Sequence, residues 1–279
     1  MSTYRPKFTI TNNMLDYINI IMEKVEELDN YNNFKKKEIF KKNNRIRSIH
    51  ATLALDSSTF SPEEVKSIIE RKYILIKEKD LLEVKNIYNA YEIINRYEQY
   101  ELKDLKRIHK IMTNSLSARS GKFRIKSEIE EDEFFLSYAD KLSTIMHSLF
   151  DFLKEKRNEI HPLILSSIAH YEIIAIKPFK EENEKAARLW QTVMLFNWEE
   201  IFAHIPIEMQ LKKYEKDYYE TINKCQETGD STLFIEFMLK IINRILTNLI
   251  RYKNKQQEKE QNQEKHDIIT KETKIKWKK

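Results

Sequence analysis

The sequence predicts an all-α fold, and its composition and periodicity support this prediction. Only 2 of the 279 residues are glycine and 5 are proline, whereas 33% are charged. Sheets and tight strand turns need more glycine, while abundant Glu, Lys and Leu favour helices. Apolar residues also recur at helical spacing along most of the chain, which is long enough to bury a sizeable core.

The first half of the chain contains several amphipathic segments. Apolar residues form one stripe over residues 15–25, and two further helices are expected within residues 79–116. Between them, Ser61 is expected to be an N-cap, with Pro62 at the first helical position and two glutamates in the first turn.

The second half begins with an irregular segment. Residues 117–138 break the helical period and include Gly121, so we expect a loop with at most a short hairpin. The tail after Arg251 has no sustained apolar stripe, which predicts a frayed helix or disorder. Between these two segments, helices are expected to start near Ala139, Pro162, Glu182, Glu208 and Ser231.

Charge and cysteine usage exclude several classes of protein. The 49 basic and 44 acidic residues form a mixed surface, so a nucleic-acid partner is not expected, although the basic tail leaves that reading open. The single Cys225 excludes an internal disulfide, and the histidines do not cluster as a zinc site would require. No apolar run suits a signal peptide or a membrane helix, so we expect a cytoplasmic protein without a membrane partner.

The most informative stretch is "IAIKPFKEENEKAARLWQTVMLF", residues 174–196. It resembles the signature of the Fic-domain (Fido) family, HPFx(D/E)GNGRxxR followed by Leu-Trp-Gln-Thr. The likeness extends from Ile10 to Leu246 in the family's order. It includes "NRIRSIHATLALDSSTFSPEEV" (44–65), "LLEVKNIYNAYE" (81–92), "SGKFR" (120–124) and "GDSTLFIEFML" (229–239).

The resemblance implies a helical Fic core with a short β-hairpin flap and an N-terminal helix that carries an autoinhibitory segment. We therefore expect an N-terminal helical region over residues 1–98, the Fic core over 99–250 and a charged tail over 251–279. The resemblance also implies transfer of AMP from ATP to a hydroxyl of a target protein, with Mg²⁺ as the cofactor.

Carried over by position, the signature identifies candidate site residues. Lys177 stands where the family's histidine acts as the general base, and Glu181 stands where the Mg²⁺ ligand is expected. Asn183, Lys185 and Arg188 stand where the family holds the nucleotide phosphates. His170 is not expected to replace the missing base, because related proteins often carry a histidine there as well.

Other positions depart from the family pattern. Glu182 and Glu184 replace the two glycines of the signature. The inhibitory-like segment is Thr52 to Ser57, in which Asp56 stands in place of a glutamate; a pair between Asp56 and Arg188 and a solvent-exposed Asp56 are both open. In the flap region, residues 137–138 are Ser-Tyr where relatives usually carry two prolines.

These substitutions argue against nucleotide chemistry. A lysine has a pKa of about 10.4 in water, so Lys177 is expected to be an ammonium that donates a proton rather than accepting one, and nearby carboxylates favour that form further. Glu182 and Glu184 place negative charge where a triphosphate would lie. Two like charges roughly 4 Å apart repel by about 4 kcal/mol at an effective dielectric constant near 20, against about 8 kcal/mol for micromolar binding.

We therefore expect a Fic-type protein whose AMP transfer is lost or severely weakened, and which acts as a binding or regulatory module or is a decaying gene product without a role. Mg²⁺ and ATP are its cofactors if it is active, and the case without any cofactor is also open. The carboxylates would then be neutralised within the protein, at the positive end of a helix dipole. The alternative is an active adenylyltransferase in which Glu181 holds Mg²⁺, Lys185 and Arg188 hold the ATP phosphates, and Lys177 orients the α-phosphate. The target protein and a homo-oligomeric state stay open.

Overall fold

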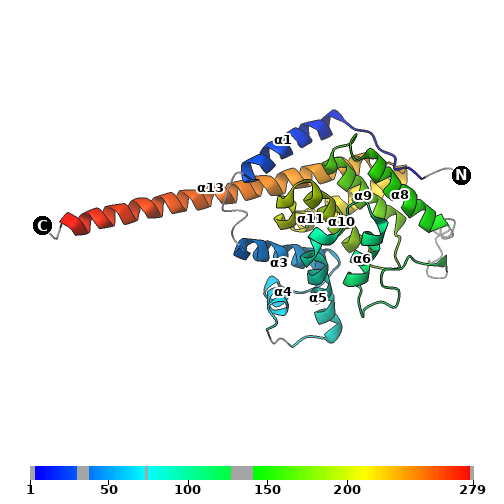
Figure 1. The fold of residues 1–279 in the computed structure, drawn as a ribbon, viewed down its shortest axis with the longest axis horizontal. Helices are drawn as coiled ribbons and strands as arrows, with labels where there is room; N and C mark the ends of the chain where they lie inside the picture. Colours follow the sequence, from blue (N-terminus) through cyan, green and yellow to red (C-terminus); the bar gives the residue numbers. More distant parts are fainter. Residues whose placement is uncertain (1–3, 30–37, 73–74, 127–140, 277–279) are drawn as a thin grey trace.

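The computed structural model describes residues 4–29, 38–72, 75–126 and 141–276 (Figure 1). These ranges contain helices and no strand, which confirms the predicted all-α fold. The loop with at most a short hairpin was predicted over residues 117–138; residues 117–126 contain no strand, and residues 127–138, with the flap positions 137–138, lie outside the described ranges. The helices are α1 (Asn12–Asp29), α3 (Glu38–Leu55), α4 (Pro62–Ile69), α5 (Glu78–Glu92), η1 (Ile94–Arg96), α6 (Leu102–Met112), α8 (Leu142–Lys156), α9 (Pro162–Ile176), α10 (Asn183–Trp198), η4 (Glu200–His204), α11 (Ile207–Lys213), α12 (Glu215–Thr228) and α13 (Thr232–Lys276).

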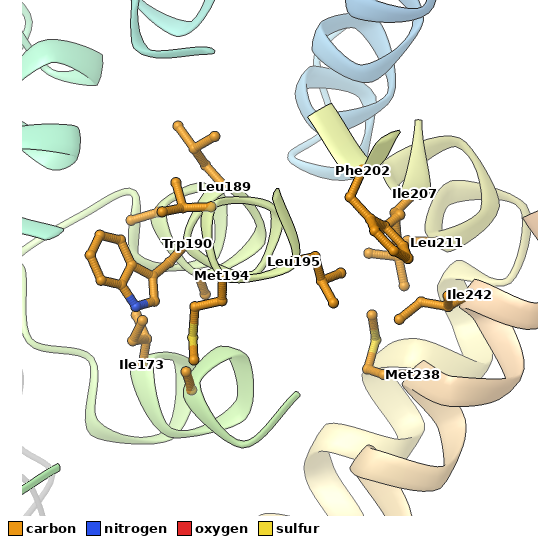
Figure 2. Packing of buried hydrophobic residues seen from close by; sticks show 14 of the residues in the cluster. Ile173, Leu189, Trp190, Met194, Leu195, Phe202, Ile207, Leu211, Met238 and Ile242 are labelled. Atoms are coloured by element: carbon orange, nitrogen blue, oxygen red, sulfur yellow. The ribbon is translucent and has the colours of Figure 1, made fainter. Parts of the chain in front are cut away.

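Two consecutive helices, α9 and α10, form the centre of the core. Every residue of α9 from Leu163 to Ile174 is buried, as expected for a helix that is apolar on all faces. Trp190 of α10 is fully buried, and Figure 2 shows it facing Ile173 of α9. This packing fixes the short loop that joins the two helices.

The other helices surround this pair. α1 lies along α13, and ion pairs and hydrogen bonds join the two; Lys24 Nζ is 2.7 Å from Thr247 Oγ1, and Lys253 Nζ is 2.7 Å from Glu27 Oε1 (Figure 1). α3 packs against α11, α4 and α5. Met238 of α13 faces the apolar side chains of η4 and α11, so the core is continuous (Figure 2).

The predicted start of α4 is confirmed. Ser61 Oγ accepts a hydrogen bond from the Glu64 amide, and the Glu64 side chain accepts one from the Ser61 amide, which is a capping box. Pro62 is the first helical residue. Of the predicted tail, residues 251–276 continue α13 as helix (Figure 1). None of the helices described here combines the length and the apolar character that crossing a membrane requires.

Candidate active site

A cavity of about 500 Å³ lies at the loop between α9 and α10. Its walls come from the end of α3, from α5 and α6, and from the loop itself. It has the size of a small-molecule site. The lining residues are Asp56, Lys79, Glu83, Ile87, Met112, Thr113, Leu116, Ile174, Lys177, Lys180, Glu181, Glu182, Asn183, Glu184 and Lys185.

The loop begins and ends with a left-handed residue that is not glycine. Lys177 ends α9 at φ 48° and ψ 64°, and Glu182 precedes α10 at φ 61° and ψ 21°. This conformation costs a residue with a side chain about 1–2 kcal/mol. Glu182 stands at a signature glycine position, so the backbone retains the shape that glycine would take there without cost.

Arg124 fixes the first part of the loop. Its Nε donates to the Lys177 carbonyl at 2.5 Å, and its Nη2 donates to the Ile176 carbonyl at 3.3 Å. Its amide also donates to the Pro178 carbonyl at 3.0 Å. These bonds satisfy carbonyl groups at the end of α9 that have no partner within the helix.

His109 of α6 anchors the middle of the loop, a role that the sequence reasoning missed. Its ring stacks on Phe179, with centroids 3.8 Å apart and planes 8° apart. Nε2 lies 3.1 Å from the Glu181 carbonyl, and Nδ1 accepts from the Gly121 amide at 2.9 Å. Burial lowers the pKa of His109 to about 4, so the ring is neutral and Nε2 is the donor. Its position on the apolar face of an amphipathic helix is the only sequence signal for this role.

Asn183 was expected to contact phosphate, but its side chain forms hydrogen bonds with the backbone of the loop. Its Oδ1 accepts from the Phe179 amide at 2.8 Å, and its Nδ2 donates to the Phe179 carbonyl at 2.9 Å. The side chain therefore closes the loop on itself at the start of α10.

Lys185 is surrounded by carboxylates. Its ammonium is 2.7 Å from Glu83, 2.7 Å from Glu182 and 3.1 Å from Asp56, and only 5% of the side chain is exposed. Glu83, on α5, was not identified from the sequence. The cluster therefore joins α3, α5 and α10.

The pKa values of Lys185 and Glu182 are both raised, but the cause differs between the two groups. Burial works to lower the pKa of Lys185, but the charges of Glu182, Asp56 and Glu83 outweigh it and raise the pKa. Burial also raises the pKa of Glu182, against the opposing charge of Lys185. Because several carboxylates share one ammonium, Lys185 gains more from the pairing than Glu182 does. Lys185 is accordingly a firmly charged cation.

Arg188 is enclosed. Its Nε donates to Thr52 Oγ1 at 2.8 Å, and its Nη2 lies 3.1 and 3.2 Å from the two Asp56 oxygens. Glu184 Oε2 is 4.0 Å from its Nη1, and none of the side chain is exposed. Burial opposes the charge, but chiefly Asp56 raises the pKa of Arg188 above its ordinary range.

The inhibitory-like segment, Thr52 to Ser57, forms the end of α3 and supplies these contacts. Ser57 is left-handed at φ 64°, and the Ser58 amide donates to the Leu53 carbonyl at 3.1 Å, which is a Schellman ending. This ending turns Asp56 toward α10. Asp56 was expected either to pair with Arg188 or to be exposed to solvent, and in the structure it pairs with Arg188.

Three further predicted residues belong to the lining of the cavity. Lys177, Glu181 and Glu184 line the cavity, and Glu184 Oε2 accepts a hydrogen bond from Tyr219 at 3.2 Å. Within the described ranges, no group of three or more His, Cys, Asp or Glu side chains is arranged to hold a metal ion. His170 is fully buried, with its ring nitrogens 2.7 Å from Gln191 and 2.9 Å from Tyr218.

The two central helices, their joining loop and the helix end that contacts it define a helical fold of the Fic type. Residues 99–195 match the family model described as "Fic/DOC family". Over these residues the chain is similar to the Fic/DOC family, as the resemblance of its loop indicated.

Curated relatives share this family at low identity. The chain is similar to "Protein adenylyltransferase Fic" of Nematostella vectensis, with 23% identity over 211 residues that cover 72% of this chain and 48% of the relative. It is 24% identical over 211 residues to the protein of the same name from Aedes aegypti, covering 72% of this chain and 41% of the relative. The chain spans less than half the length of these two relatives.

Solved structures show the same fold. The crystal structure of a Fic family protein from Desulfovibrio desulfuricans G20 is similar with a TM-score of 0.82 and 28% identity, covering 90% of this chain and 78% of that one. Fic-1 (residues 134–508) from C. elegans has a TM-score of 0.67 at 15% identity, covering 87% and 73% of the two chains.

Proposed function

We propose that this Fic-family protein, related to protein adenylyltransferases, does not transfer AMP and acts as a protein-binding or regulatory module. The observation that carries the proposal is the closed ionic cluster at the start of α10. Both cations expected to hold phosphates, Lys185 and Arg188, are instead neutralised by carboxylates of the same chain.

The residues present do not fit Mg·ATP. Arg188 is wholly enclosed, and Lys185 is almost so. Seating a triphosphate against them would require moving Asp56, Glu83 and Glu182 away from their partners. The side chains of Glu182 and Glu184 would then face phosphate charge, and like charges at that range repel by several kcal/mol.

The base position supports the same proposal. Lys177 carries an amine in place of an imidazole, and an ammonium has no lone pair with which to accept a proton. His170 is fully buried and engaged on both ring nitrogens, so it does not reach the cavity.

Calorimetric titration with Mg·ATP tests the proposal. We expect no binding in the micromolar range for the wild-type chain. Micromolar binding that Arg188→Ala weakens would contradict the proposal and favour the alternative of an active adenylyltransferase.

A restoration experiment tests the cause. The combined variant Lys177→His, Glu182→Gly, Glu184→Gly and Lys185→Arg is expected to incorporate label from α-labelled ATP into itself or into lysate proteins. The matched control carries Lys180→His instead of Lys177→His, which places the imidazole elsewhere in the same loop. Label incorporated by the wild-type chain and abolished by Glu181→Ala would overturn the proposal.

A further inference from the structure

A second cavity, of about 560 Å³, lies at the end of α9. It is formed by the N-terminal segment, by the start of α8, by the last turns of α9 and by the end of α12. It shares Lys177 with the candidate active site, and its other lining residues are different. Its volume lies within the range of small-molecule sites.

The inner wall of this cavity is largely apolar. Leu142 and Ile145 of α8 face it from one side, and Ala175 and Ile176 of α9 from another. Leu142 and Ile145 belong to the buried core. Such a surface suits an aliphatic or aromatic body, whose burial contributes about 25 cal/mol per Å².

The polar part of the lining is mainly cationic. Arg5, Lys7, Arg124 and Lys177 contribute to it. Arg5 is also paired with Glu155, with Nη2 and Oε2 3.1 Å apart. Among the lining residues that the structure describes, positive charge exceeds negative charge, which favours an anionic group.

Of the described lining residues, one carries a carboxyl group, namely Glu172. It is buried and accepts a hydrogen bond from the Tyr4 hydroxyl. Burial raises the pKa of Glu172 to about 7, so near neutral pH this group is in part protonated and repels an anion less than an ordinary glutamate would.

We propose that this cavity binds a small organic anion, whose apolar body lies against Ile145 and Ala175 and whose charged group lies toward Lys7. This inference goes beyond the proposed function and does not depend on it, because it concerns the opposite side of the α9 terminus.

Fluorescence titration of the full chain with two probes tests the proposal. One probe is 8-anilinonaphthalene-1-sulfonate, an aromatic anion, and the other is N-phenyl-1-naphthylamine, which has a similar body and no charge. We expect saturable binding of the anion at one site. Ala175→Leu, which fills the cavity, should weaken both probes, whereas Lys7→Glu should weaken only the anion, by roughly five-fold or more.

Matched controls separate the cavity from the general surface. Ala118→Leu adds the same bulk at an exposed alanine, and Lys240→Glu makes the same charge reversal on an exposed lysine of α13; neither position lines the cavity. Both controls should leave the two affinities unchanged. The proposal is overturned if the wild-type chain shows no saturable binding of the anion. It is equally overturned if Ala175→Leu or Lys7→Glu leaves that binding unaltered in a chain whose circular dichroism is native.

Discussion

Arg188 Nη2 contacts both carboxylate oxygens of Asp56, at 3.1 and 3.2 Å, and so joins the first turns of α10 to the end of α3. Removing one partner of a fully buried ion pair costs about 3–5 kcal/mol, because the other charge is left without compensation. The Asp56 side chain is 24% exposed, so part of that cost is screened by solvent.

We therefore expect Asp56→Asn to lower the free energy of unfolding by about 2 kcal/mol at pH 7, as measured by urea denaturation. Asp16→Asn, at an exposed position of α1, is the control and should change it by less than about 0.5 kcal/mol. Equal effects of the two substitutions would mean that the Asp56 pair contributes nothing to stability.

Substitutions at Glu182 measure the free-energy cost of a left-handed backbone conformation in the loop. Glu182→Gly and Glu182→Ala both remove the carboxylate from Lys185, but only glycine adopts φ 61° without strain. The glycine variant should be more stable than the alanine variant by about 1 kcal/mol.

Glu220, exposed within α12, provides the matched control. There the order should reverse, with glycine less stable than alanine by about 1 kcal/mol, because the residue is in an ordinary helix. The same order at both positions would show that residue 182 is not left-handed in solution.

The two glycines of the chain differ in the space available for a side chain. Both have positive φ, at 71° for Gly121 and 63° for Gly229. A Cβ at Gly121 would lie 2.8 Å from Lys110 Cβ and 2.9 Å from the Lys106 carbonyl oxygen, whereas one at Gly229 would meet nothing within 4 Å.

Gly229→Ala should therefore cost about 1 kcal/mol, which is the left-handed penalty alone. Gly121→Ala should cost at least about 2 kcal/mol, since overpacking adds to that penalty. Thermal unfolding of both variants checks the difference, and similar melting temperatures would count against the close approach of Gly121 to α6.

Glu172 predicts a pH dependence of stability. Its pKa is raised by burial from 4.5 to about 7, so the folded state holds this proton more tightly than the unfolded state does. The stability from this group is fully present below pH 4.5 and is lost as the pH rises through about 7.

Glu172→Gln stays neutral at every pH and escapes this loss. Relative to the wild-type chain, its free energy of unfolding should therefore rise by about 3 kcal/mol between pH 4.5 and pH 8. Glu23→Gln, at an exposed position of α1, should show no such trend in the same urea titrations. A parallel pH profile for Glu172→Gln and the wild-type chain would indicate an ordinary carboxyl at this position.

Local rules explain which parts of the fold could be predicted. The Ser61 N-cap and the start of α9 at Pro162 depend on residues close in sequence, and both appear as expected. The predicted start at Glu208 is one residue late, because α11 begins at Ile207 after Pro206. Helix ends shift by such amounts without any change in packing.

The candidate site was predictable only where position in the signature identified a residue. Lys177, Glu182 and Lys185, which the signature identified, line the cavity. Glu83 and His109 escaped notice, because their partners lie on other helices and no spacing links α5 or α6 to the loop. Arg188 was expected to face a ligand, yet it is enclosed by Thr52 and Asp56, a burial that depends on how α3 packs.

The length of α13 would separate a molecule bound near its C-terminal end from the globular part of the protein. Lys253 still pairs with Glu27 of α1. Residues 254–276 continue the helix beyond this contact, and at a rise of about 1.5 Å per residue they measure roughly 35 Å (Figure 1). A molecule bound near Lys276 would be held away from the globular part, in a direction that the helix axis sets. The helix thus has the geometry of a spacer, which sets the distance between the globular part and a molecule bound at the end of the helix.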